Sequence, residues 1–156
     1  MKTWTRPTLI LAAFLSFTAY SAAPTASHIN MTKQIDDGIE WTKHLQDDIR
    51  KGTKSDPKGI EDKLAGIKSF LSAMNQSAEQ IITDSPSEKG EGHFSEMRRF
   101  QEAATLAAKE FPLVEPGKNP NFSAMKAASN RILKNLKSAK YWHDRELSEI
   151  EKSAKD

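Results

Sequence analysis

Residues 56–82 read DPKGIEDKLAGIKSFLSAMNQSAEQII and carry the strongest fold signal in the chain. Asp56 can cap a helix, and Pro57 is favoured at the first helical position because its missing N–H needs no partner there. Apolar residues then recur every three or four positions, which places them on one helical face; they are Ile60, Leu64, Ile67, Leu71, Met74, Ala78 and Ile81. The stretch predicts an amphipathic helix over 57–82.

The same apolar spacing predicts three more helices, and no segment alternates as a half-buried strand would. They cover 30–50, 95–111, and a last segment that opens at the cap-like pair Asn119-Pro120 and reaches about residue 152. Stretches rich in Ser, Pro, Gly and charge separate them. Four amphipathic helices bury their apolar stripes most simply as an antiparallel up-down-up-down bundle. We therefore expect an all-α, antiparallel up-down-up-down four-helix bundle.

The N-terminus has the three-part layout of a secretory signal peptide. Lys2 and Arg6 precede an apolar run over 9–17, and small residues follow up to Ala23. This run is well short of the roughly 20 residues that a membrane span needs. We predict that residues 1–23 are a signal peptide and that 24–156 form one helical domain, exported to the periplasm and not membrane-bound after cleavage.

Charge and cysteine content exclude several classes of function. Without Lys2 and Arg6 the 23 Lys and Arg residues fall to 21, equal to the 21 Asp and Glu residues. A neutral chain without a clustered basic stripe argues against a nucleic-acid partner. The chain has no cysteine, which excludes disulfides, thiol catalysis and thioether-attached haem. Any cofactor must be held noncovalently.

One polar side chain, His143, stands on the apolar stripe of the last helix, among Met125, Ala128, Ile132, Leu136, Ala139, Leu147 and Ile150. In an antiparallel bundle, pairing Arg50 with Ala124 by helix length places Met31 level with His143. A methionine sulfur and an imidazole nitrogen facing each other are the axial ligands of a low-spin electron-transfer haem. Met31 and His143 are therefore candidate iron ligands. The alternatives are a histidine hydrogen-bonded within the core and a methionine that only fills space.

Several short motifs resemble the cytochrome b562 family of periplasmic four-helix haem proteins. These are Asn30-Met31 at the start of the first helix, IEDKL over 60–64, SEMRRF over 95–100, and His143 late in the fourth helix. The resemblance implies one noncovalent haem b per chain, with Met31 and His143 as axial ligands and Met97 and Phe100 packing on the porphyrin. It also implies a monomer that transfers electrons with an unknown redox partner and is not an enzyme.

Two departures from the family pattern favour an alternative function. Ala104 stands where the family has a second aromatic residue on the third helix, and the fourth helix continues well past His143. The alternative is a haem-free exported helical bundle that binds another molecule. A secreted effector is a further alternative and would show a large exposed apolar patch. His93 is the substitute ligand if Met31 is not one, whereas His28 and His44 complete no zinc or di-iron spacing.

Overall fold

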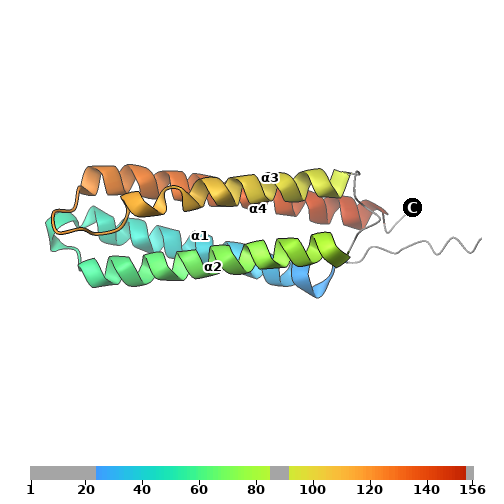
Figure 1. Cartoon of the computed structure of the whole chain (residues 1–156), viewed down its shortest axis with the longest axis horizontal. Helices are drawn as coiled ribbons and strands as arrows, with labels where there is room; N and C mark the ends of the chain where they lie inside the picture. The colour runs from blue at the N-terminus through green and yellow to red at the C-terminus, as the bar shows by residue number, and fades with distance from the viewer. Residues whose placement is uncertain (1–23, 85–91, 154–156) are drawn as a thin grey trace, which may run out of the picture.

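The computed structural model describes residues 24–84 and 92–153. Within them it contains four α-helices and two short 3-10 turns and no strand: α1 (Ala26–Arg50), η1 (Gly52–Lys54), α2 (Pro57–Asp84), α3 (Gly92–Ala108), η3 (Phe111–Leu113) and α4 (Phe122–Ser153). Figure 1 shows the helices side by side, with successive helices running in opposite directions. This confirms the predicted all-α, antiparallel up-down-up-down four-helix bundle.

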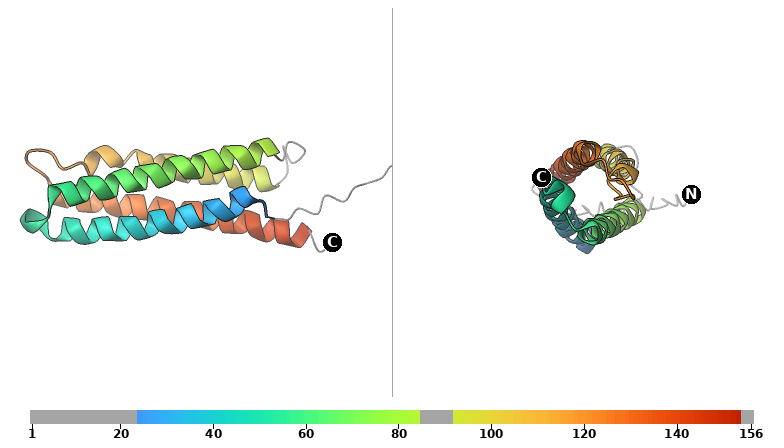
Figure 2. Two further views of the ribbon diagram at one scale, coloured as in Figure 1. Left: turned by 90° about the horizontal axis from the view of Figure 1, so that it is seen from below. Right: turned by 90° about the vertical axis from the view of Figure 1, so that its left-hand side faces the viewer.

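The helices do not pack equally on one another. α1 packs closely against both α2 and α4, and α3 packs closely against α4, whereas α2 and α3 make few contacts. Viewed down the bundle axis, the four helices surround one central core (Figure 2). The first half of α1 thus faces the last half of α4, which is where the candidate ligands lie.

The core is built from the predicted apolar stripes. Its largest fully buried side chains include Ile35, Leu45, Ile60, Ile67, Met74, Met125, Ile132 and Leu136. The stripe predicted on α4 needs one correction. His143 is not the one polar residue on it, because Glu146 is buried as well and Leu147 is only half-buried.

Several helix boundaries differ from the prediction, among them the start of α3, which lies three residues earlier at Gly92. α1 begins four residues earlier, after Thr25, and α3 ends at Ala108 because the chain turns into η3 before Pro112. The Asn119-Pro120 pair does not cap α4. Asn121 does so, since its Oδ1 accepts the backbone N–H of Ala124 at 3.0 Å. The start of α2 at Pro57 is confirmed.

The α1–α2 interface contains one close approach that only glycine permits. The indole ring of Trp41 on α1 lies over Gly66 of α2, where an added Cβ would be 2.6 Å from Cε3 of the ring. Phe70 meets the same ring edge-on, with 5.9 Å between ring centroids. Gly66 therefore sets how closely the two helices approach at this level.

None of the described helices combines the length and the apolar character that crossing a bilayer requires. The predicted signal peptide, residues 1–23, lies outside the described residues.

Candidate functional site

The site begins at the first turn of α1, where Thr25 caps the helix with the help of His28. The backbone N–H of Thr25 donates to Nδ1 of His28 at 3.2 Å, and the Thr25 hydroxyl lies 2.8 Å from the same nitrogen. Because Nδ1 accepts a backbone N–H, the proton of the neutral His28 ring is on Nε2. The cap therefore holds the His28 ring in one orientation. The ring is buried, with 3% of the residue exposed.

Glu146 on α4 faces His28 across the α1–α4 interface. Its Oε1 lies 3.4 Å from Nε2 of His28, and Glu146 is itself 1% exposed. A buried carboxylate needs partners that offset the loss of hydration. His28 provides one such partner, so the two residues link the start of α1 to the end of α4.

His143, one turn before Glu146, is fully buried and bonded to Thr32. Its Nε2 lies 2.8 Å from the Thr32 hydroxyl, and that hydroxyl also donates to the backbone carbonyl of His28 at 3.1 Å. Because the hydroxyl hydrogen is used on the carbonyl, Thr32 accepts the N–H of His143. The proton of His143 is therefore on Nε2, and Nδ1 carries a lone pair.

Nδ1 of His143 is a buried nitrogen with no hydrogen-bond partner in the part of the chain that the structure describes. Leaving such a group unpaired costs about 1–3 kcal/mol. Burial lowers the pKa of His143 from 6.5 to about 4, helped by the neighbouring His28 side chain and the Lys140 ammonium and opposed by the His28 carbonyl and Asp36. The imidazole is consequently neutral at neutral pH and has a free lone pair.

We call His28, Thr32, His143 and Glu146 the buried histidine cluster. The two imidazole rings are nearly parallel, with an angle of 18° between their planes and 6.3 Å between their centroids. Among the described residues, no three His, Cys, Asp or Glu side chains are grouped so that they could hold a metal ion by themselves. The cluster is thus a polar contact between two helices in which Nδ1 of His143 and Nε2 of His28 make no hydrogen bond within the described residues.

The residues expected around a haem all lie in the core. Met31, Met97 and Phe100 are at most 1% exposed, and so is Ala104. Met31 directly precedes Thr32, so the Thr32–His143 bond puts Met31 and His143 at the same level of α1 and α4. The His93 side chain, the substitute ligand, lies outside the described part of the structure.

The residues present fit the donor set of a haem iron. His143 supplies a neutral buried imidazole with an unpaired nitrogen, and Met31 supplies a buried sulfur at its level. If the iron binds Nε2 of His143, the hydrogen bond between that nitrogen and the Thr32 hydroxyl has to break.

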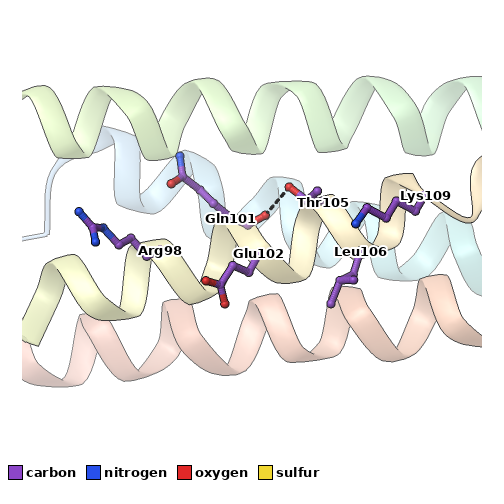
Figure 3. Close-up of a pocket in the computed structure, with 6 residues that line it drawn as sticks. All are labelled: Arg98, Gln101, Glu102, Thr105, Leu106 and Lys109. Carbon is purple, nitrogen blue, oxygen red and sulfur yellow. Dashed lines mark hydrogen bonds between the residues drawn. The ribbon is translucent and has the colours of Figure 1, made fainter.

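The surface grooves of the molecule lie elsewhere. One of about 530 Å³ is lined by α3 and the residue that follows it; the lining residues are Arg98, Gln101, Glu102, Thr105, Leu106 and Lys109 (Figure 3). A second, of about 390 Å³, lies between α1 and α2 beside Trp41 and Gly59. Neither contains Met31 or His143, and five of the six residues that line the first groove are polar or charged types. We assign no function to either groove.

Sequence reasoning missed His28, Thr32 and Glu146. A signal for His28 was available, since His28, Met31 and Ile35 share one helical face and Thr25 is a good N-cap residue. The Thr32–His143 bond joins residues 111 positions apart and has no local signal.

Comparison of the chain with family models, with curated proteins and with solved structures gave no match.

Proposed function

We propose that this protein is a periplasmic electron-transfer protein that binds one haem b noncovalently, with Met31 and His143 as axial ligands. The observation that carries the proposal is the neutral, fully buried imidazole of His143 with an unpaired nitrogen, at the level of the buried Met31. When bound, the haem supplies an iron that gains or loses one electron. The fold class and the resemblance of the short motifs add support.

In this proposal each residue has a defined task. His143 offers a lone pair to the iron without first losing a proton, because its pKa is far below neutral pH. The Met31 sulfur would be the second ligand of the iron and would raise the reduction potential relative to a second histidine. Met97 and Phe100 pack on the porphyrin and keep water away from it.

A second candidate function, a haem-free exported bundle that binds another molecule, has its own supporting observation. Nε2 of His143 is already engaged by Thr32. Ala104 is buried where a second aromatic side chain was expected in the family pattern. The large exposed apolar side chains lie on different elements, on α1, α3, η3 and α4, so the effector alternative gains no support from them; they are Ile29, Trp41, Leu106, Leu113 and Tyr141.

The test is a haem titration of the purified protein followed by visible spectroscopy. We expect saturation at one equivalent and the sharp reduced bands of six-coordinate low-spin iron. His143→Ala should abolish this spectrum, whereas His44→Ala, which changes an exposed histidine, should not. Met31→Leu keeps the side-chain volume but removes the sulfur. It should leave haem bound and five-coordinate or water-ligated.

Met125→Leu is the matched control, because Met125 is equally buried but belongs to the other end of α4. Its spectrum should equal that of the wild type. Absence of saturable haem binding by the wild-type protein would favour the haem-free alternative.

A further inference from the structure

The solvent-facing side of α4 carries cations that outnumber their counter-charges. Residues 122–142 contain five Lys or Arg residues and no Asp or Glu. Two of the five reach acidic residues elsewhere: Arg131 pairs with Glu110 at 2.9 Å, and Lys140 pairs with Asp36 of α1 at 3.1 Å.

The other three are Lys126, Lys134 and Lys137. All are exposed, and none forms an ion pair with any residue in the ranges 24–84 and 92–153. Cations on α1 differ in this respect, because each has an acidic neighbour one turn away; these pairs are Lys33–Asp37, Lys43–Glu40 and Arg50–Asp47. Over 122–142, α4 therefore carries surface charge that is left uncompensated, unlike α1.

Helix geometry brings the three lysines to one face. At about 100° per residue, Lys126, Lys134 and Lys137 fall within a quarter of the helix circumference, and they span roughly 16 Å along the axis. Along the chain the three lysines are eight and three residues apart and look scattered. They form a row only on the helix.

Aromatic and arginine side chains continue this row towards the end of α4. Tyr141 is 53% exposed and meets the Trp142 ring edge-on, with 4.9 Å between centroids. The guanidinium groups of Arg99 and Arg145 lie 4.4 Å and 5.9 Å from the centroid of Trp142. The neighbouring Tyr141 side chain raises the pKa of Arg145, and Arg145 pairs with Glu96 at 3.3 Å.

Tyr, Trp and Arg are the residue types that contribute most to protein–protein binding energy. Here they hold one another in place, so little side-chain freedom remains to be lost on binding. Arg99 has no acidic partner among the described residues. Trp142 directly precedes His143, so this patch lies on the outside of the helix turn that carries the proposed iron ligand.

We propose that the face of α4 formed by Lys126, Lys134, Lys137, Tyr141 and Arg145 is a docking surface for an acidic protein. Carboxylates of the partner would pair with the three free lysines, and its contact would centre on Tyr141, Trp142 and Arg99. This inference rests on the proposed function in one respect, namely that the partner is the redox protein that exchanges electrons with the haem.

The charge pattern favours a protein over other polyanions. Asp144, Glu96 and Asp36 lie beside the patch and would oppose a continuous phosphate backbone. A membrane surface would call for exposed apolar side chains between the lysines. The residues between them on this face are the polar Asn130, the small Ala127 and the half-buried Leu133, and none of them is a large, fully exposed apolar side chain.

The experiment maps binding on the isotope-labelled protein by amide chemical shifts, at low and at moderate salt. The probe is a short synthetic peptide of alternating Glu and Gly, which carries the carboxylates of an acidic protein surface. We expect shifts at Lys134, Lys137 and Tyr141. The double variant K134E/K137E should weaken binding about tenfold, because charge complementarity is lost. K54E/K58E, which reverses two exposed lysines on η1 and α2 and not on α4, should change it little.

Equal weakening by both double variants, or shifts that avoid α4, would overturn the proposal. Tighter binding of a short DNA duplex or of phosphatidylglycerol vesicles to this face, at the same salt, would overturn the assignment to a protein. The mapping is done with and without haem. Peptide binding by a protein that takes up no haem would refute the electron-transfer function and leave the docking surface standing.

Discussion

Thr32 and His143 are joined by a hydrogen bond of 2.8 Å that crosses the interface between α1 and α4. Each side chain gains its orientation from the other helix. Thr32 also donates to the carbonyl of His28, so it accepts the N–H of His143 and fixes which nitrogen carries the proton. Removing this bond should therefore have different effects on a protein that binds haem through His143 and on one that binds no haem.

Replacing Thr32 by valine removes the hydroxyl and keeps the shape of the side chain. The buried N–H of His143 then has no acceptor, and we expect the haem-free protein to lose about 1–3 kcal/mol of unfolding free energy in urea titrations. If the iron binds Nε2, the same change removes a competitor, and haem affinity should rise.

Thr42→Val is the matched control for that experiment. Thr42 is fully buried, and its hydroxyl donates to the carbonyl of Gly38 within α1. Thr42→Val should lower the unfolding free energy by less than Thr32→Val does, and it should leave haem affinity unchanged. Lower haem affinity in Thr32→Val would mean that Thr32 supports the ligand nitrogen, contrary to our expectation.

The stability of the haem-free protein should fall as the pH decreases from 6.5 to about 4. In the unfolded chain a histidine binds a proton near pH 6.5, whereas burial lowers the pKa of native His143 to about 4. Between these values the unfolded state binds more protons, so unfolding becomes easier as the pH falls, and the contribution of His143 is fully present only above pH 6.5. The loss of unfolding free energy across this pH range is on the order of 3 kcal/mol.

Urea midpoints measured across this pH range check that prediction. His143→Gln keeps an N–H group for Thr32 but does not titrate, so its midpoint should depend less steeply on pH. His28, Glu146, Asp36 and Lys140 also surround the ring and remain in both proteins. Equal slopes for wild type and variant would show that His143 is not the titrating group.

Haem should raise the melting temperature if it binds only the native bundle. A ligand present at a thousandfold excess over its Kd stabilises the native state by about 4 kcal/mol. The gain should be absent in His143→Ala. Identical melting curves of the wild-type protein with and without haem would refute the proposed function.

Gly66→Ala should destabilise the bundle despite the better helix propensity of alanine. The new Cβ would come within 2.6 Å of the Trp41 ring, so the ring or the helix must move, at a typical cost of about 1–3 kcal/mol. In the Trp41→Ala background the clash is gone, and Gly66→Ala should then stabilise the helix by up to ~1 kcal/mol.

Thermal unfolding of these four proteins gives the interaction energy between the two positions. Gly117→Ala serves as a control, because a Cβ there meets nothing within 4 Å. A loss caused by Gly66→Ala that is the same in both backgrounds would argue against the contact with Trp41.

Much of this architecture follows from local sequence, because each helix needs only its own apolar spacing and end signals. Asp56 and Pro57 mark the start of α2 where the structure has it. The start of α4 was misplaced because two similar signals compete, and the Asn121 side chain accepts the N–H group in place of Asn119. Local signals therefore predict that a helix exists better than where it begins.

The site could be predicted only in part. Antiparallel packing was enough to bring Met31 and His143 to one level, since that depends on helix lengths alone. The partners of His143 depend on how two distant helices are rotated against each other, which no local pattern encodes. Burial of Glu146 in place of Leu147 has the same origin, because a small rotation of α4 exchanges which of the two faces the core.

The buried histidine cluster also has a consequence for how α1 and α4 align along their axes. An apolar seam with similar side chains at every turn allows one helix to slide by a turn, about 5.4 Å, at little cost. Such a slide here would separate Thr32 from His143 and Glu146 from His28, and would leave the buried side chains of His28, His143 and Glu146 without these partners. The cluster therefore favours one axial register of α1 and α4, whether or not a cofactor is bound.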